Sequence, residues 1–337
     1  MKAYELHANE GFDALTRVVR DTPPLGPHEV LVRVRAVSLN YRDLGIAQRA
    51  KARPRPKPLI PTSDGAGEVA AVGSAVTRFR GGERVAGIFF PTWIEGGLFA
   101  AAHAHALGGS VDGMLAEEVV LDEQAWVEVP EHLSFEEAAT LPCAGVTAYN
   151  ALFKGPHLGP GDTLLVQGTG GVSIFALQLG KAVGARVIVT SKSEEKRQRA
   201  RSLGADHVID YRATAAWGEA ANAWTGGRGV DLVVDVGGPG TFDQSVAALR
   251  YEGSMSILGV LTGIKGEINT YGMFHKGLRV RGVYVGSRRM FEALNRAISA
   301  VQLRPIVDRV FSFDEAKAAY EYLASGAHFG KVVISVS

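Results

Sequence analysis

Short apolar runs alternate with helical patterns through the middle of the chain, from residue 163 to about residue 285. The alternation begins with an apolar run at residues 163–167, a helix-forming stretch at residues 174–183 that ends at Gly184, and a β-branched run at residues 186–190. Further helices are predicted from Ser193, with Gly204 as the stop, and at residues 241–249. The other strand patterns lie at residues 207–211, 231–235, 254–258 and 279–285. Strands that alternate with helices in this way predict an α/β fold with a doubly wound parallel sheet of six strands.

The flanking parts of the chain have a different pattern. Short alternating strands at residues 29–37, 68–73 and 83–87 are separated by dense glycine and proline, with Gly81 and Gly82 as a turn. From about residue 288 a helix, strand, helix and strand follow, at residues 290–301, 307–311, 314–325 and 331–336. We expect residues 1–130 and 287–337 to form one antiparallel, barrel-like domain, interrupted by a nucleotide-binding domain at residues 131–286.

Two irregular stretches are expected to be loops that border a cleft. Residues 51–61 carry four prolines and, with Arg49, five basic residues, which is typical of an extended exposed loop. Residues 91–113 show no regular pattern. Loops of this kind set substrate specificity, and their sequence does not identify the substrate.

Composition limits the classes of function. A chain of 337 residues with 46% apolar side chains is long enough for two cores. The 36 basic and 35 acidic residues leave a formal net charge of +1, which argues against nucleic acid or an anionic membrane as the main partner. Cys143 is the single cysteine of the sequence, so no intrachain disulfide is expected. With no apolar signal segment and no run of about 18 apolar residues, we expect a cytoplasmic protein that does not span a membrane.

A glycine cluster follows the first of the central strands. It comprises Gly168, Thr169, Gly170, Gly171, Val172 and Ser173. Gly168 and Gly170 permit a tight turn and a close approach of ligand to backbone, and Ser173 is small enough for the helix to pack on the strand. A phosphate can then bind the helix N-terminus. Serine stands where glycine or alanine is usual, so the strand-turn-helix context carries the prediction of a dinucleotide site.

The end of the second central strand favours NADPH over NADH. Sheets that select NAD usually carry Asp or Glu about 20 residues beyond the glycines, to bond the ribose hydroxyls. This chain has no carboxylate there: Ser191 can donate a hydrogen bond, and Lys192 with Lys196 or Arg197 can neutralise a 2′-phosphate. The alternative is that residues 194–199 are only the solvated face of a helix, with NADH as the cofactor.

The motifs together resemble those of the medium-chain dehydrogenase/reductase family over essentially the whole chain. They lie at residues 27–32, 38–43, 63–69, 82–85, 138–142, 168–173, 203–206 and 330–333. The resemblance implies a GroES-like catalytic domain, a Rossmann domain, and a homodimer formed through the edge strands of the Rossmann sheet. It also implies hydride transfer between a nicotinamide cofactor and a small-molecule substrate.

The resemblance also assigns positions around the cofactor. Asn40 and Thr147 correspond to residues near the nicotinamide and its phosphate, and Lys331 to one that faces the pyrophosphate. The backbone of the cofactor cleft and the surroundings of the carboxamide and adenine correspond to Val236, Gly237, Gly259, Val260, Val285, Gly286 and Tyr211. Each position has a structural alternative, because the glycines can be ordinary strand-end turns and Asn40 can cap a local turn.

The chain departs from the zinc-dependent branch of this family. That branch has Cys where this chain has Asn40 or Tyr41, a His-Glu pair where it has Asp64 and Gly65, and a four-cysteine lobe in the region of residues 91–113. Catalytic zinc needs three protein ligands and structural zinc four, and one cysteine cannot supply them. His103 and His105 indicate a solvated loop, and Cys143 a small buried side chain. The chain therefore resembles the zinc-independent, quinone-reductase-like branch.

Without a metal, a carbonyl that accepts hydride needs hydrogen-bond donors or a positioned acid. By motif position the candidates are Tyr41, Asn40 and Arg42, with Tyr41 the first choice; a salt bridge between Arg42 and Asp43 is the structural alternative. We expect an NADPH-dependent oxidoreductase of quinones, enones or related carbonyls. The alternatives are an alcohol dehydrogenase that recruits metal through Asp43, Asp64 and Glu68, and a cofactor-binding protein with a non-enzymatic role.

Overall fold

The computed structural model describes residues 1–7, 11–48 and 58–336 and divides the chain into two compact units. Unit 1 comprises Met1–Val146 and Val285–Ser337, and unit 2 comprises Thr147–Tyr284. The first division thus follows Val146 rather than residue 130. Most of the loop expected at residues 51–61 lies outside the described residues; of the remainder, Leu59 pairs with Leu6.

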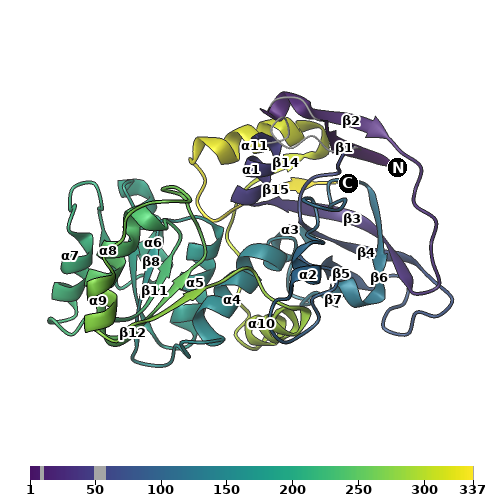
Figure 1. The fold of residues 1–337 in the computed structure, drawn as a ribbon. Helices are drawn as coiled ribbons and strands as arrows, with labels where there is room; N and C mark the ends of the chain where they lie inside the picture. Colours follow the sequence, from purple (N-terminus) through teal and green to yellow (C-terminus); the bar gives the residue numbers. More distant parts are fainter. Residues whose placement is uncertain (8–10, 49–57, 337) are drawn as a thin grey trace. The chain divides into compact units, whose positions relative to one another are not determined.

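Unit 2 contains one sheet of six parallel strands, which confirms the sequence prediction (Figure 1). The strands are β8 (Thr163–Gln167), β9 (Arg186–Thr190), β10 (His207–Ile209), β11 (Val230–Asp235), β12 (Leu249–Ile257) and β13 (Arg279–Gly282). Their order across the sheet is β10-β9-β8-β11-β12-β13. The strand order therefore reverses between β8 and β11, which makes the ends of these two strands the switch point of the sheet.

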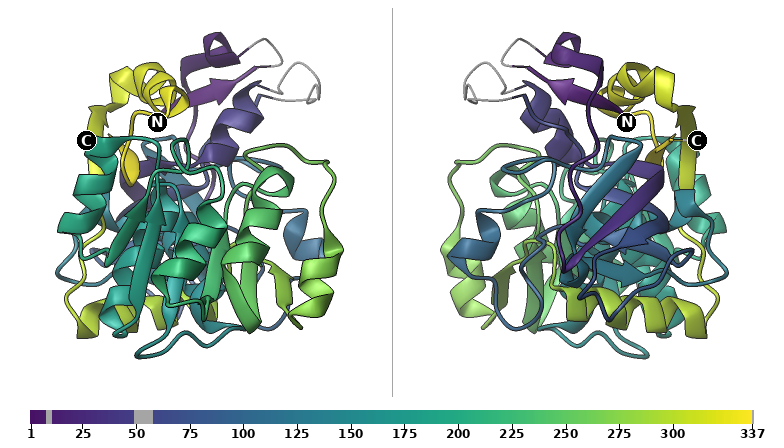
Figure 2. Two further views of the ribbon diagram at one scale, coloured as in Figure 1. Left: turned by 90° about the vertical axis from the view of Figure 1, so that its left-hand side faces the viewer. Right: turned by 90° about the vertical axis from the view of Figure 1, so that its right-hand side faces the viewer.

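Helices cover both faces of this sheet (Figure 2). They are α4 (Val146–Phe153), α5 (Gly171–Ala182), α6 (Glu194–Ser202), α7 (Trp217–Trp224), α8 (Pro239–Ala248) and α9 (Thr270–His275). Leu165 of β8 packs in a cluster with side chains of α7 and α8, whereas its neighbour Leu164 lies beside Gly180 of α5. Successive residues of a strand point to opposite faces, so both faces are buried and β8 is a continuous apolar run rather than an alternating one.

Local polar contacts set the ends of several elements. Ser193 caps α6 through its hydroxyl, as predicted. β10 ends at Ile209 rather than at residue 211, because Asp210 turns back to accept from the N–H groups of two following residues. β13 ends at Gly282, before Val285, whose φ of +55° does not continue a strand. Lys276 Nζ donates to the carbonyls of Val246, Ala247 and Leu249 at the end of α8.

Unit 1 is built on a sheet of seven strands, mostly antiparallel, and a separate two-stranded sheet. The two-stranded sheet pairs β1 (Lys2–Leu6) with β2 (Leu15–Val19). The larger sheet comprises β3 (Glu29–Leu39), β4 (Asp64–Val72), β5 (Arg84–Gly87), β6 (Glu118–Asp122), β7 (Trp126–Glu128), β14 (Val307–Ser312) and β15 (Lys331–Ser335). The long strand β3 pairs with β6 through its first half and with β15 through its second half, so it joins the two ends of the chain.

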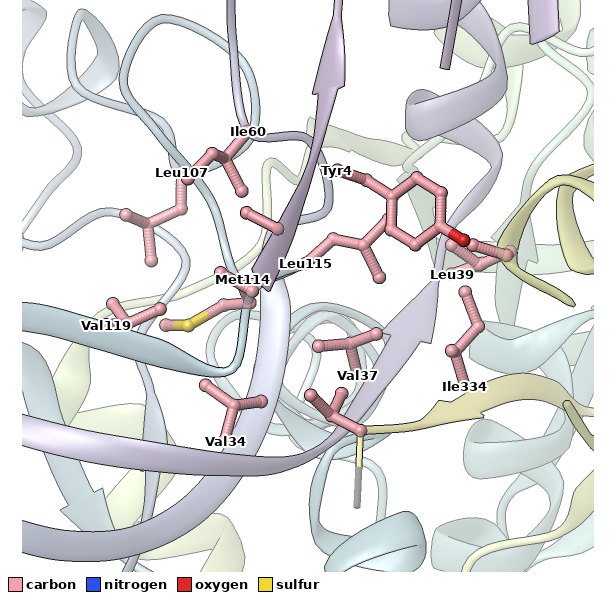
Figure 3. Close-up of a cluster of buried hydrophobic side chains, with 14 of the residues drawn as sticks. Tyr4, Val34, Val37, Leu39, Ile60, Leu107, Met114, Leu115, Val119 and Ile334 are labelled. Carbon is pink, nitrogen blue, oxygen red and sulfur yellow. The ribbon is translucent and has the colours of Figure 1, made fainter. Parts of the chain in front are cut away.

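The core of unit 1 lies against β3. Figure 3 shows Tyr4, Val37, Leu39, Met114 and Ile334 among its buried side chains. The helices of the unit are α1 (Tyr41–Gln48), α2 (Ala100–His103), α3 (Phe135–Ala138), α10 (Arg288–Ala300) and α11 (Ala316–Ser325), with single turns η1 (Gly11–Ala14), η2 (Glu123–Ala125), η3 (Leu141–Gly145) and η4 (Phe313–Glu315). In the described part of the chain, no helix is both long enough and apolar enough to cross a membrane.

Candidate functional site

The glycine cluster of unit 2 forms the turn from β8 into α5. Gly168 has a φ of +71° and Gly170 is the N-cap of α5. A Cβ atom added to either glycine would meet no heavy atom within 4 Å. Ser173 Oγ donates to the carbonyl of Gln167 over 2.7 Å, which ties the first turn of the helix to the strand. The turn therefore combines an uncapped helix N-terminus with open space at both glycines, and it fits the phosphates of a dinucleotide.

The other residues of the cluster follow the same turn. Thr169 is buried, and Gly171 and Val172 are half-buried. The N–H group of Gly168 donates to the carbonyl of Thr190 over 2.8 Å, so the turn is also held to β9.

The loops after β11 and β12 contain glycines that packing requires. A Cβ atom on Gly237 would clash with the side chain of Thr241, and one on Gly259 would clash with the carbonyl of Val236. These contacts give both glycines a structural role in the strand-end turns. Their place beside a cofactor remains a prediction, as does that of Val260, which is 49% exposed.

The region beyond the ends of β9 and β10 gathers basic side chains. The N–H group of Ser191 donates to the carbonyl of Ile209, so residues 191–192 lie beside residues 210–212. Lys192 and Arg212 are exposed, and neither side chain forms a hydrogen bond or ion pair with another described residue. Tyr211 between them is 38% exposed. Two cations thus lie beside Ser191, of which the sequence reasoning found only Lys192.

Arg197 is already engaged within unit 2, unlike its predicted role at a phosphate. Its guanidinium donates to the carbonyl of Ser191 over 2.7 Å and pairs with Asp210 over 2.8 Å and with Glu194. The N–H group of Lys196 bonds to the capping Ser193. The helix face at residues 194–199 is thus partly the solvated, self-paired surface that the alternative interpretation predicts.

Unit 1 contains a buried polar cluster at the end of β3. Lys331 Nζ donates to Asn40 Oδ1 over 2.6 Å and to the carbonyl of Leu39 over 2.7 Å. Asn40 Nδ2 lies 3.5 Å from Ser63 Oγ, and the hydroxyl of Ser63 donates to Asp64 Oδ1 over 2.7 Å. Asp64 Oδ2 accepts from the N–H group of Cys143. The pairing of β3 with β4 and β15 brings these residues together from distant parts of the sequence.

Burial shifts the titration of this cluster toward neutral forms. Burial raises the pKa of Asp43 to about 6, opposed by Arg42 and by the N–H group of Asn40. Burial also raises the pKa of Asp64, opposed by Lys331, and lowers the pKa of Lys331, opposed by Asp64. The pKa of the Cys143 thiol is raised, chiefly by burial. Since a thiolate is the reactive form of cysteine, Cys143 is an inert thiol, in keeping with its predicted role as a small buried side chain.

The backbone at Thr62, just before the cluster, is in an unusual conformation. Thr62 is fully buried with a φ of +73°, a region that β-branched residues rarely adopt. Its hydroxyl and that of Tyr320 lie 3.2 Å apart, and its carbonyl accepts from Met114. The close backbone of Gly108 and Gly113 leaves no room for a Cβ atom beside it. The surrounding structure thus fixes Thr62, and with it the positions of Ser63 and Asp64.

The predicted donors Asn40, Tyr41 and Arg42 have different environments. Asn40 is 8% exposed and belongs to the cluster, whereas Tyr41 begins α1 and is 63% exposed. The Arg42 guanidinium donates to the carbonyl of Leu107, contacts Asp43 over 3.3 Å and lies over the ring of Phe89. These contacts give Arg42 the structural role considered as its alternative.

The remaining family positions lie where the two units join along the chain. Thr147 is buried in α4 of unit 2, and Val285 and Gly286 begin the second segment of unit 1. A Cβ atom on Gly286 would lie 2.5 Å from Val146, so packing alone requires glycine there.

The described residues offer poor metal chemistry. Among them, no group of three or more His, Cys, Asp or Glu side chains is placed to hold a metal ion. Asp64 and Glu68 are four residues apart on β4, which separates them by roughly 13 Å at about 3.3 Å per residue. A set of ligands comprising Asp43, Asp64 and Glu68 therefore does not converge on one ion.

Sequence reasoning missed several polar side chains, and topology explains why. Ser63 follows Thr62 without a motif of its own, and Arg212 is visible only once β10 is known to lie beside β9. Gln167 and Asp235 are the last residues of β8 and β11. The strand order of a doubly wound sheet would have placed this pair at the same edge.

Comparisons with known proteins agree with this architecture. A family model described as alcohol dehydrogenase GroES-like domain matches residues 26–131, and one described as zinc-binding dehydrogenase matches residues 171–300. A zinc-type alcohol dehydrogenase-like protein of Schizosaccharomyces pombe is 44% identical over 97% of this chain and 96% of its own length. A quinone oxidoreductase of Pseudomonas aeruginosa is 32% identical over 94% of each chain.

A similar solved structure is that of an NAD-dependent alcohol dehydrogenase. It is 32% identical, covers 100% of both chains and has a TM-score of 0.91. With a GroES-like part, a Rossmann-like parallel sheet and relatives similar over nearly their whole length, the chain belongs to the medium-chain dehydrogenase/reductase family and is an oxidoreductase of that family.

Proposed function

We propose that this oxidoreductase uses NADPH to reduce a quinone, an enone or a related carbonyl, without catalytic zinc. The choice of NADPH depends on one observation, the two exposed cations Lys192 and Arg212 beside Ser191. The hydroxyl of Ser191 accepts from the N–H group of Ser193 and keeps its own proton to donate. A 2′-phosphate would meet two positive charges and a hydroxyl there.

The nearby carboxylate of Asp210 does not oppose this interpretation. It pairs with Arg197 over 2.8 Å and accepts from two backbone N–H groups. These contacts compensate its charge, so its repulsion of a phosphate is weak. The similar structure described as NAD-dependent makes the opposite preference a clear alternative outcome.

The proposal of zinc-free chemistry is supported by the donors of the polar cluster. Zinc binds thiolate, imidazole and carboxylate. The cluster has instead an amide and a hydroxyl at Asn40 and Ser63, and a thiol whose pKa burial raises, at Cys143. Both oxygens of Asp64 already accept hydrogen bonds. The cluster is better suited to holding hydrogen-bond donors in place than to binding a metal.

Bound NADPH would supply the hydride, held by the glycine turn and the residues beside β9. The carbonyl oxygen then needs a donor as its negative charge develops. Lys331 has only N–H donors, so its bond to Asn40 Oδ1 fixes which end of the amide is the oxygen. The Asn40 amide therefore offers N–H groups on its other side, and the exposed hydroxyl of Tyr41 is a second donor.

The printed names of the relatives favour one other substrate class. Several are alcohol dehydrogenases, and oxidation of an alcohol is the same hydride transfer in reverse. A screen must therefore cover both directions.

We also propose that the protein is a homodimer through the edge of the parallel sheet. Within the described residues β13 is an edge strand. Tyr251, Tyr271 and Phe274 are each at least 60% exposed and lie on β12 and α9. Light scattering with size-exclusion chromatography tests this: the mass of a single chain would refute it.

The main test is an oxidation screen with NADPH and NADH over quinones, enones, aldehydes and ketones, with alcohols in the reverse direction and metal analysis of the same sample. We expect a preference for NADPH and no stoichiometric zinc. Lys192→Glu should lower the ratio of kcat/KM for NADPH to that for NADH by about 10- to 100-fold, because a charge-assisted contact of about 1.5–3 kcal/mol is lost. Lys265→Glu, at an exposed lysine of the same unit, is the matched control. A preference of the wild type for NADH would refute the cofactor argument, and zinc lost together with activity would refute the zinc-free chemistry.

A further inference from the structure

Gln167 and Asp235 meet at the switch point of the parallel sheet. They are the last residues of β8 and β11, which lie side by side (Figure 1). The register pairs Val166 with Val234, so the next residue of each strand is at the same level. Both side chains are buried, at 5% and 1% exposed. In open α/β sheets the crevice outside these strand ends is where ligands bind.

Asp235 is an acceptor surrounded by donors. Its Oδ1 accepts from the N–H groups of Gly237 and Gly238 over 2.9 and 2.8 Å. Its Oδ2 accepts from Gln167 Nε2 over 2.8 Å and from Ser245 Oγ over 2.6 Å, and Thr241 Oγ1 lies 2.9 Å from both oxygens. This carboxylate therefore holds the loop after β11 through its backbone and connects it to β8 through Gln167.

Gln167 completes the connection on the other side. Its Oε1 accepts from the N–H groups of Val236 and Gly237 over 3.3 Å each. Its main-chain carbonyl accepts from Ser173 Oγ, and its next residue is Gly168. One residue thus contacts the glycine turn through its main chain and the loop after β11 through its side chain.

We propose that Asp235 and Gln167 are positioning residues that hold residues 168–173 and 236–238 in one arrangement before the cofactor binds. Neither side chain needs to touch the cofactor for this role. A loop that is ordered in the free protein loses less conformational entropy on binding, so the pair raises affinity for the dinucleotide. This inference rests on the proposed function for the nature of the ligand.

The arrangement allows a test by exchange of polarity. Asp235→Asn places an amide N–H against Gln167 Nε2, and Gln167→Glu places two carboxylates against each other. In the double variant the carboxylate introduced on β8 can accept from the amide introduced on β11 and from the N–H groups of residues 236 and 237. The contacts are then restored with their direction reversed. Ser245→Ala removes one donor to Asp235 but no contact with either loop, and is the matched control for lost stability.

The first measurement is binding of NADPH, NADH and ADP-ribose to each variant by calorimetry, together with thermal stability. We expect each single variant to bind about 10- to 100-fold more weakly and the double variant to return to within about threefold of wild type. KM for the cofactor should change, with kcat at saturating cofactor nearly unchanged. A loss of affinity no larger than that of Ser245→Ala at equal loss of stability, or no recovery in the double variant, would overturn the proposal.

The second measurement is amide hydrogen exchange in the free protein. Asp235 does not contact residues 168–173 directly, so faster exchange there in Asp235→Asn, reversed in the double variant, is expected only if the loops are coupled. Faster exchange confined to residues 236–238 would overturn the inference. Failure of the proposed function is a different result, because wild type would then bind none of the three ligands.

Discussion

The buried carboxyl of Asp43 should make the stability of unit 1 depend on pH. Its side chain is 1% exposed, and burial raises its pKa from 3.8 to about 6 against the opposing effects of Arg42, the Asn40 N–H group and Lys331. Between these values the folded state binds more protons than the unfolded state, so the free energy of unfolding falls as pH rises. The stabilisation is complete below the unfolded pKa and is lost as pH rises through 6.

The size of the effect follows from the shift. About two pKa units at about 1.36 kcal/mol each give a total of about 3 kcal/mol. About 2 kcal/mol of this falls between about pH 4.5 and about pH 7.5. Asp43→Asn keeps the shape and one acceptor oxygen but does not titrate. The stability of the variant relative to wild type should therefore increase by about 2 kcal/mol over this pH range.

Urea unfolding followed by tryptophan fluorescence at several pH values measures this difference. Subtracting the two proteins removes the contributions of groups that titrate alike in both. Asp21→Asn, at an exposed carboxylate, is the control and should give a constant difference. A constant difference for Asp43→Asn, within about 0.5 kcal/mol, or one of opposite sign, would refute the role of burial at this site.

Two further predictions concern stability. Lys276→Met removes three donated hydrogen bonds at the end of α8 and should lower the free energy of unfolding of unit 2 by about 2–3 kcal/mol, whereas Lys265→Met at an exposed lysine should change it little; equal urea midpoints for both variants would contradict this. Gly326 ends α11 with a φ of +67° and Gly45 lies inside α1, and an added Cβ would meet nothing within 4 Å at either. Gly326→Ala should therefore destabilise by about 1 kcal/mol and Gly45→Ala should stabilise by about 0.5–1 kcal/mol, and thermal unfolding that shifts both variants in the same direction would show that backbone conformation does not decide these sites.

The parallel sheet was predictable because its signals are local. The apolar run at residues 163–167, the glycine turn and the cap at Ser193 each lie within one turn or strand of the element that they define. The polar cluster of unit 1 was not predictable in this way. Lys331 and Asn40 are 291 residues apart, and only the pairing of β15 with β3 brings them together. Arg42 likewise finds its carbonyl partner at Leu107, and no periodicity in the sequence indicates such a contact.

The pairing of β3 with β15 has a consequence for how the protein forms during synthesis. Unit 2 is one continuous stretch of chain, and all strands of its sheet have left the ribosome before β15 is made. Unit 1 has to wait, because β3 is synthesised early and its partner is among the last residues added. Closing so long a loop is slow, and domains generally fold as units while the chain is being made. The cluster around Asn40 is therefore expected to assemble after the glycine turn, which makes the part of the site closest to the reacting carbonyl the last to form.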